Sequence, residues 1–218
     1  MVDNQHWLDR WEENRIGFHE DSVNQYLQTW LPQFELSAGA TVFLPLCGKA
    51  QDINWLAQQG YKVIGIELSQ LAIEAFFAEN SLNCERQETD RFVTYRSGNI
   101  TLLQGDFFDL NSDDLSICSL IYDRAALIAM ELPDRPRYYE QMLSITPPQC
   151  NMLLITLEYD QAEMLGPPFS VPTGEVSRNY AGVFSIKLLE SADIVDERPR
   201  WRKVGLTALT ESIFRLDR

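Results

Sequence analysis

Two segments near the start of the chain repeat apolar residues at the spacing of a helix turn. In residues 3–14, the side chains of Trp7 and Trp11 would lie on one helical face. In residues 20–33, a run of regularly spaced apolar side chains would likewise form one face. We therefore predict two amphipathic helices and assign residues 1–40 to an N-terminal helical extension.

After this extension the pattern changes to short apolar runs that alternate with helical segments. Such runs are typical of strands covered on both faces. They occupy residues 41–46, 62–67, 100–103, 116–122 and 151–159. Helical periodicity occurs at residues 51–59, 70–80 and 134–145. Strands and helices in this order, with short connections, predict right-handed parallel βαβ units.

The last part of the chain has a third pattern. Residues 182–189 and 206–216 alternate apolar and polar side chains, as antiparallel strands with one solvated face do. Together with the parallel units, they predict an α/β sheet that is mostly parallel, has an antiparallel edge and carries helices on both faces. Because no linker divides the sequence, we expect one domain over residues 1–218.

Composition and charge narrow the environment and the partners of the protein. Its 218 residues are 45% hydrophobic and 23% charged, which is typical of a globular chain. No apolar run approaches the roughly 20 residues of a transmembrane helix, and no signal-peptide pattern is visible, so we expect a soluble, cytoplasmic protein. The net charge of −14 repels phosphate backbones and anionic lipids. We therefore expect small molecules or other proteins as partners, and neither nucleic acid nor membrane.

The cysteine and histidine pattern gives no indication of a metal site. Four cysteines lie more than thirty residues apart, and neither histidine is near one of them in sequence. Zinc sites and disulfide frameworks need closer or more numerous cysteines than this. We predict that most of the four cysteines are buried, reduced thiols, and we predict no bound metal.

Polar residues follow four of the predicted strands at the point where each one ends. Gly48 follows the first strand, Glu67 ends the second, and Asp106 and Arg124 follow the third and fourth. Ligands of doubly wound sheets bind at this edge. Glu67 lies nineteen residues beyond Gly48, the spacing at which an acid reaches the ribose of a nucleotide cofactor. An acid at the end of one strand is often only a helix cap or a turn residue. Polar groups at the ends of four strands together favour a binding site.

The glycine pattern indicates what kind of cofactor this edge binds. A dinucleotide site needs G-x-G-x-x-G after the first strand, so that backbone amides hold a pyrophosphate. This chain has only Gly48 there, which disfavours a nicotinamide-dependent oxidoreductase. A nucleoside cofactor without phosphates, such as S-adenosylmethionine, remains allowed.

Six motifs, spread in order over nearly the whole chain, resemble those of the thiopurine S-methyltransferase family. They are WEENRIGFH at 11–19, FLPLCGK at 43–49, GIELS at 65–69, GDFFD at 105–109, YDRAAL at 122–127 and GPPFSVP at 166–172. The resemblance implies a Rossmann-like class I methyltransferase fold with a seven-stranded sheet. It also implies a monomer with S-adenosylmethionine as methyl donor and S-adenosylhomocysteine as product. The implied acceptor is the sulfur of an aromatic or heterocyclic thiol such as a thiopurine, with selenium and tellurium compounds as further acceptors of a bacterial member.

The resemblance also assigns roles to individual residues, with the N-terminal extension covering the cofactor site. The positions assigned to the cofactor are Trp11, Leu46, Glu67, Asp106, Phe107 and Arg124. Those assigned to the acceptor are Phe18 and Arg198. Arg198 belongs to a basic stretch, residues 198–203, which sequence alone describes only as a solvated loop. The tryptophan at position 7 we expect instead to be a core residue that ties the extension to the sheet.

Arg124 is the residue that we expect to act in catalysis. Aromatic thiols ionise near neutral pH, and a neighbouring positive charge favours the thiolate form. An arginine at the site can therefore take the place of a general base. Two alternatives remain open at this stage: a class I methyltransferase with an oxygen or nitrogen acceptor, and a non-catalytic module that binds a nucleoside.

Overall fold

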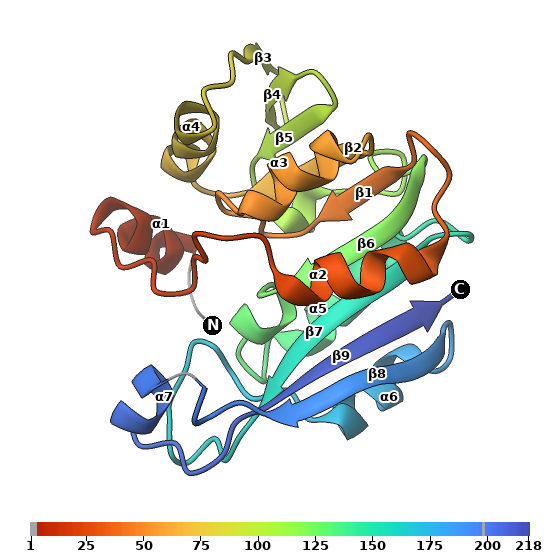
Figure 1. Cartoon of the computed structure of the whole chain (residues 1–218). Coiled ribbons are helices and arrows are strands. Elements are labelled where there is room, and N and C mark those ends of the chain that lie inside the picture. The colour runs from red at the N-terminus through yellow and green to blue at the C-terminus, as the bar shows by residue number, and fades with distance from the viewer. Residues whose placement is uncertain (1–3, 198) are drawn as a thin grey trace.

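One sheet of nine strands organises the chain in the computed structural model, which describes residues 4–197 and 199–218 (Figure 1). The order across the sheet is β3-β4-β5-β2-β1-β6-β7-β9-β8. The strands are β1 (Thr41–Leu44), β2 (Lys62–Glu67), β3 (Glu85–Glu88), β4 (Val93–Ser97), β5 (Ile100–Gln104), β6 (Cys118–Arg124), β7 (Asn151–Glu158), β8 (Ser185–Asp193) and β9 (Thr210–Asp217). The five central strands pair in parallel, and the strands outside them pair antiparallel. The predicted α/β architecture with helices around a largely parallel sheet is confirmed.

Helices cover both faces of this sheet. The α-helices are α1 (Asn4–Glu12), α2 (Gln25–Trp30), α3 (Gln51–Gln58), α4 (Gln70–Glu79), α5 (Arg135–Ile145), α6 (Thr173–Tyr180) and α7 (Pro199–Lys203). Three short 3-10 helices are η1 (Leu31–Phe34), η2 (Phe107–Asp109) and η3 (Leu127–Ala129). In Figure 1, α2 and α3 lie in front of the sheet, while α5 and α6 lie behind it.

The alternation of side chains along the strands supplies two hydrophobic cores, one on each face. Val42 and Leu44 of β1 belong to the core that α2, α3 and α4 cover, whereas Phe43 belongs to the core under α5 and α6. All three side chains are at most 3% exposed. This two-sided burial explains why β1 and its parallel neighbours appear in the sequence as continuous apolar runs.

The sheet has two strands more than the seven that the family resemblance implied. The additional strands are β3 and β4, a hairpin that extends the sheet beyond β5 through antiparallel pairing. All four residues of β3 are exposed and polar or charged, so this strand shows no hydrophobic pattern in the sequence. The predicted strand count was wrong for that reason, while the other seven strands correspond to the predicted ones.

The second N-terminal helix begins later than the predicted 20–33. Asn24 caps α2, because its side-chain oxygen accepts hydrogen bonds from the backbone N–H groups of Tyr26 and Leu27. The N–H of Asn24 itself donates to Asp52 Oδ1 at 2.8 Å, which ties the start of α2 to α3. Residues 13–24 are therefore neither helix nor strand, and we call them the strap.

The order of the strands determines where a ligand can bind. β1 lies between β2 and β6, and the chain crosses from one side of β1 to the other, which makes this the switch point of the sheet. The carboxyl ends of the parallel strands all point to the same edge. A crevice forms outside that edge in doubly wound folds.

Candidate active site

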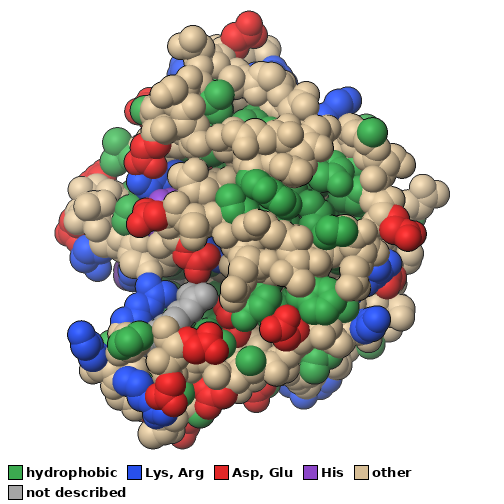
Figure 2. Space-filling view, in the orientation of Figure 1, with side chains coloured by type: hydrophobic (Ala, Val, Ile, Leu, Met, Phe, Trp, Pro, Cys, Tyr) green, Lys and Arg blue, Asp and Glu red, His purple; other side chains and the backbone are tan. Residues whose placement is uncertain are grey.

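A cavity of about 560 Å³ lies at this edge of the sheet, a volume in the usual range for small-molecule sites. Its inner wall consists of the turns that follow β1, β2, β5 and β6, together with side chains of β7. Its outer wall consists of residues from α1, the strap and α7. Figure 2 shows the surface hollowed between the region over α1 and the region over α7.

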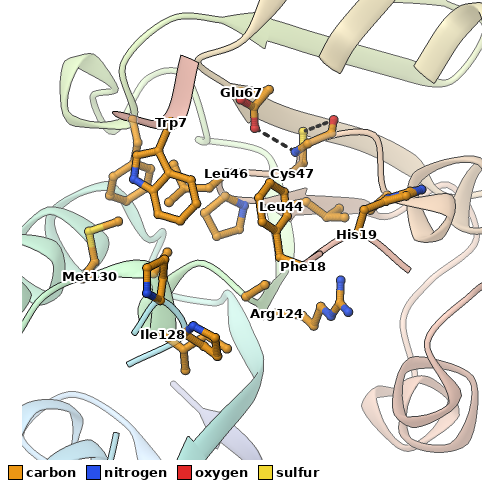
Figure 3. Close-up of a pocket in the computed structure, with 18 of the residues that line it drawn as sticks. Trp7, Phe18, His19, Leu44, Leu46, Cys47, Glu67, Arg124, Ile128 and Met130 are labelled. Carbon is orange, nitrogen blue, oxygen red and sulfur yellow. Dashed lines mark hydrogen bonds between the residues drawn. The ribbon is translucent and has the colours of Figure 1, made fainter. Parts of the chain in front are cut away.

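The cavity brings together seven of the eight residues to which the sequence analysis assigned a ligand. They are Trp11, Phe18, Leu46, Glu67, Asp106, Phe107 and Arg124. The eighth, Arg198, lies outside the described residues. Figure 3 shows Glu67 and Arg124 on opposite sides of Phe18, so the two charged groups face different parts of the cavity. The roles of these residues toward a ligand remain predictions.

Glu67 is a buried carboxylate that two backbone amides orient. Its Oε2 accepts from the N–H of Gly48 and its Oε1 from the N–H of Ser69, both at 2.8 Å. Burial raises the pKa of Glu67, and these hydrogen bonds to its charged form oppose the shift. A carboxylate has about four acceptor sites, so each oxygen can accept a further hydrogen bond from a ligand hydroxyl. The nineteen-residue spacing seen in the sequence thus corresponds to a direct contact between the two strand ends.

The turn after β1 has an unusual backbone. Leu46 has a φ of 45° and Gly48 a φ of 51°, both in the left-handed region. A Cβ on Gly48 would come within 3.1 Å of the indole of Trp11. Glycine at this position therefore lets α1 approach the turn closely, and this packing places Trp11 at the mouth of the cavity.

Aromatic rings from α1 and the strap cover the cavity. The rings of Trp7 and Trp11 both meet Phe18 edge to face, with centroids 5.8 and 5.6 Å apart. The guanidinium of Arg10 lies 5.5 Å from the centre of the Phe18 ring. Trp7 lines the cavity and none of α1 is buried, so its prediction as a core residue was wrong.

Arg124 lies at the end of β6 in a cluster of charged and polar groups. Its Nη2 is 2.7 Å from Glu20 Oε2 of the strap, and both side chains are largely buried. The buried carboxyl of Asp52 is nearby and accepts a hydrogen bond from the hydroxyl of Tyr122 at 3.4 Å. Burial alone would lower the pKa of Arg124, but Glu20, Tyr122 and Asp52 outweigh it and raise this pKa. The guanidinium is therefore fully charged.

The turn after β5 forms the wall opposite Arg124. Asp106 caps η2 by accepting from the N–H of Phe108 at 2.9 Å, and it also accepts from the amide of Asn4 in α1 at 3.0 Å. Phe107 stacks on the buried ring of Tyr138, which fixes the turn against α5. The guanidinium of Arg137 lies 3.7 Å from the centre of the Phe108 ring. This wall therefore combines two aromatic rings, which meet each other edge to face, with the polar groups of Asp106 and Arg137.

The segments after β6 and β7 are held together by one buried ion pair. Arg135 donates to Glu175 Oε2 at 2.8 Å and to the carbonyls of Ser170 and Met130 at 2.7 and 3.1 Å. Met130 lines the cavity, and Pro167 and Pro168 line it from the second segment. The ion pair thus determines the distance between two walls of the site.

Asp123, one residue before Arg124, gives this region a pH dependence. It accepts from Tyr138 Oη at 2.8 Å and from the N–H of Leu127 at 3.2 Å. Burial nevertheless raises the pKa of Asp123 to about 6. Because this pKa lies above that of the unfolded chain, its contribution to stability is complete below about pH 4 and is lost as the pH rises through 6.

We expect the variant Asp123→Asn to lack this dependence. The free energy of unfolding of the native protein, relative to the variant, should fall by about 2.4 kcal/mol between pH 4 and pH 7. Urea denaturation of both proteins across this range measures the difference. Shifts of other carboxyls are common to both proteins and cancel. Parallel curves for the two proteins would contradict the assignment.

The sequence analysis did not identify several residues that line the cavity. Among them are Glu20, Asp52 and Tyr122 around Arg124, and Arg10, Arg137 and Arg200 near the opening. Signals existed for Glu20, which directly follows the motif at 11–19, and for Tyr122, which begins the motif at 122–127. No local pattern indicates Asp52, because the fold brings it to Tyr122 over 70 residues of sequence.

Two kinds of chemistry have no support among the described residues. Within residues 4–197 and 199–218, no group of three or more His, Cys, Asp or Glu side chains is arranged to hold a metal ion. Cys47 lines the cavity, but burial raises the pKa of its thiol and Glu67 adds to this effect. A thiol kept in its neutral form is a poor nucleophile.

In that described part of the chain, no helix is long and apolar enough to cross a membrane.

The fold and the site together define a class of protein. A Rossmann-like sheet with a ribose-type acid after the second strand, and without a phosphate-binding glycine loop, is the arrangement of class I methyltransferases. Solved structures agree with this fold. A SAM-dependent methyltransferase from Anabaena variabilis matches with a TM-score of 0.64 and 14% identity, over 99% of this chain and 95% of that one. A 1,6-didemethyltoxoflavin-N1-methyltransferase from Burkholderia thailandensis matches with a TM-score of 0.62 and 13% identity, over 99% of this chain and 87% of that one.

Sequence comparison defines the family. Residues 2–218 match the family described as thiopurine S-methyltransferase (TPMT). A thiopurine S-methyltransferase from Pseudomonas putida is 43% identical over 97% of this chain and 98% of that protein. One from Pseudomonas paraeruginosa is 46% identical over 97% of both chains. The chain belongs to the thiopurine S-methyltransferase family, and the resemblance seen in its motifs is confirmed.

The enzymes of this family depend on S-adenosylmethionine, and the residues at the cavity fit that cofactor. The cofactor has two ribose hydroxyls, a flat adenine and no phosphate. The structure has an oriented carboxylate at Glu67, the aromatic side chains of Phe107 and Phe108 in the turn after β5, and a turn with a single glycine after β1. The ribose, the adenine and the lack of phosphates of the cofactor therefore each have a corresponding feature in the cavity.

Proposed function

We propose that this protein transfers a methyl group from S-adenosylmethionine to the sulfur of an aromatic or heterocyclic thiol, such as a thiopurine. The observation that carries the proposal is the separation of two charged groups across one aromatic-lined cavity. Glu67 lies on one side and Arg124 on the other, with Phe18 between them (Figure 3). A neutral ribose suits the carboxylate, and an anionic sulfur suits the guanidinium.

On the donor side, Glu67 would accept hydrogen bonds from the ribose hydroxyls. The backbone N–H groups of Gly48 and Ser69 already hold its carboxylate, so little side-chain freedom is lost on binding. Asp106 and Phe107 would border the adenine, while Leu46 and Trp11 would enclose the remainder of the cofactor. When bound, S-adenosylmethionine supplies an electrophilic methyl group on a positively charged sulfur.

On the acceptor side, Arg124 would favour the thiolate over the thiol. An opposite charge within a few ångströms lowers the pKa of an acid, and here the guanidinium lies in a largely buried site. The thiolate then attacks the methyl carbon, the bond from that carbon to the donor sulfur breaks, and the electron pair remains on the donor sulfur. No proton needs to move during the transfer, so the protein needs no general base.

The rest of the cavity would align the two reactants and exclude water. Phe18 offers a ring on which a flat acceptor can stack. Arg200 of α7 donates a hydrogen bond to the carbonyl of Gly17 at 2.7 Å, which joins α7 to the strap across the opening. Holding two reactants in line within a closed site accounts for a large part of the rate of such displacements.

Calorimetric titration with S-adenosylhomocysteine, using NADH as control, tests the donor half of the proposal. We expect the first ligand to bind and the second not to bind. Preference for NADH, or no binding of S-adenosylhomocysteine, would overturn the assignment of the donor site.

Methylation assays with matched acceptors test the acceptor half. Thiophenol and a thiopurine should be methylated, while phenol and aniline, which replace sulfur by oxygen and nitrogen, should not. Methylation of the oxygen or nitrogen compounds instead would identify a different acceptor class. Binding of S-adenosylhomocysteine with no methyl transfer to any of them would indicate a non-catalytic module. Selenite and tellurite in the same assay test the further acceptors that the family resemblance implies.

A further inference from the structure

Arg124 has an anionic partner within the protein itself. The ion pair with Glu20, at 2.7 Å between Nη2 and Oε2, leaves the two side chains 17% and 24% exposed. The buried carboxyl of Asp52 is also close enough to influence Arg124. The positive charge that an acceptor anion would need is thus already compensated by Glu20 and its neighbours.

The carboxylate that pairs with Arg124 belongs to an irregular segment and has a second hydrogen-bond donor in Asn24. Glu20 lies in the strap, two residues after Phe18, and lines the same cavity. The side-chain amide of Asn24 lies 3.4 Å from the same Glu20 Oε2 that contacts Arg124. Asn24 is held in place as the cap of α2, so its amide already donates to this carboxylate from a fixed position.

We propose that Glu20 is an internal competitor for Arg124, which gives way only to an acceptor that carries negative charge. This inference rests on the proposed function. In the exchange, the acceptor anion takes the place of the Glu20 carboxylate on the guanidinium, and Glu20 stays with Asn24 and water. No covalent bond changes, and the guanidinium has one anion in direct contact before and after the exchange.

The exchange explains why a neutral acceptor would not displace Glu20 from Arg124. If a neutral molecule displaced Glu20, it would leave the buried guanidinium without its close anionic partner, which is strongly unfavourable. An anion restores the pair. A neutral acceptor would therefore bind with the Glu20–Arg124 pair in place, and only an anion would reach the guanidinium.

Replacement of Glu20 by glutamine tests this inference. The variant Glu20→Gln keeps a hydrogen-bond acceptor for Arg124 but removes the negative charge. The probe is 4-nitrophenolate, the oxygen analogue of an aromatic thiolate, whose absorbance reports its ionisation. We expect it to bind the variant roughly 5- to 20-fold more tightly than the native protein, because the internal competitor is gone. The neutral 4-nitroanisole should bind both proteins equally.

A neighbouring carboxylate provides the matched control. The variant Asp21→Asn makes the same charge change one residue away, at a fully exposed side chain that pairs with His19 at 3.5 Å. It should bind 4-nitrophenolate as the native protein does. Equal or weaker binding by Glu20→Gln, or an equal gain for 4-nitroanisole, would overturn the inference and leave Glu20 a positioning residue of Arg124.

The titrations separate this inference from the proposed function. They are carried out with and without S-adenosylhomocysteine, so they need no methyl transfer. Failure of the proposed function would appear as absent donor binding by the native protein. Failure of the competition would appear as unchanged 4-nitrophenolate affinity in Glu20→Gln. Thermal unfolding of each variant verifies that it is folded before either result is interpreted.

Discussion

The variant Glu67→Ala is expected to lose nearly all affinity for S-adenosylhomocysteine. Two hydrogen bonds between ribose hydroxyls and a charged carboxylate contribute about 1.5–3 kcal/mol each, so the dissociation constant should rise at least about 100-fold. The same substitution leaves the N–H groups of Gly48 and Ser69 without their acceptor. We therefore also expect a loss of about 1–3 kcal/mol in the free energy of unfolding. Calorimetry and urea denaturation measure the two effects.

A second glutamate provides the control for this experiment. Glu74 lies on the exposed side of α4, one helix turn beyond the cap at Ser69, and accepts a hydrogen bond from the side chain of Gln70 at 2.7 Å. The variant Glu74→Ala changes the net charge equally and should bind S-adenosylhomocysteine as the native protein does. Should Glu67→Ala bind within a few-fold of the native protein while remaining folded, Glu67 would have no ribose contact and would serve only to join β1 and β2.

Arg124→Ala is expected to slow methyl transfer without abolishing donor binding. Loss of a preorganised charge at a reacting group costs on the order of 100- to 1000-fold in rate. The pH–rate profile should also change. Without the guanidinium the bound thiol ionises at higher pH, so the rise in rate should move to higher pH. Steady-state rates at saturating donor across pH 5–9 provide the measurement.

Two further variants test whether the effect of Arg124→Ala comes from the loss of positive charge at this position. Arg178, exposed on α6 behind the sheet, allows the same change of net charge far from the cavity, and Arg178→Ala should leave the profile unchanged. Arg124→Lys should recover part of the rate, because it restores the charge without the planar fork. A profile and a rate identical to those of the native protein would remove the electrostatic role of Arg124.

The parts of the fold that have two-sided burial were predictable from the sequence. β1 and its parallel neighbours form apolar runs in the sequence because both their faces are covered. The ligand edge followed from the rule that parallel strands end together. Glu67 and Gly48 were assigned to this edge from the sequence, and the structure adds a hydrogen bond between them.

The parts of the structure that the sequence did not predict either carry no hydrophobic pattern or depend on contacts between segments far apart in the chain. β3 is exposed along its whole length, so its residues carry no hydrophobic signal. The start of α2 was missed because Asn24 competes for the backbone N–H groups that a longer helix would use. The group around Arg124 depends on side chains from α3, β6 and the strap, whose proximity only the folded chain determines.

Both outer strands of the sheet discourage the addition of a further strand from another molecule. β3 places charged and polar side chains along one open edge, where none of its residues is buried. At the other edge, β8 carries Lys187 and Glu190, and its register shifts between Leu188 and Glu190. Charged side chains and irregular pairing are the features by which natural sheets avoid joining edge to edge. Polymerisation through continuous sheets is therefore disfavoured at both ends, even though the sheet is open rather than closed into a barrel.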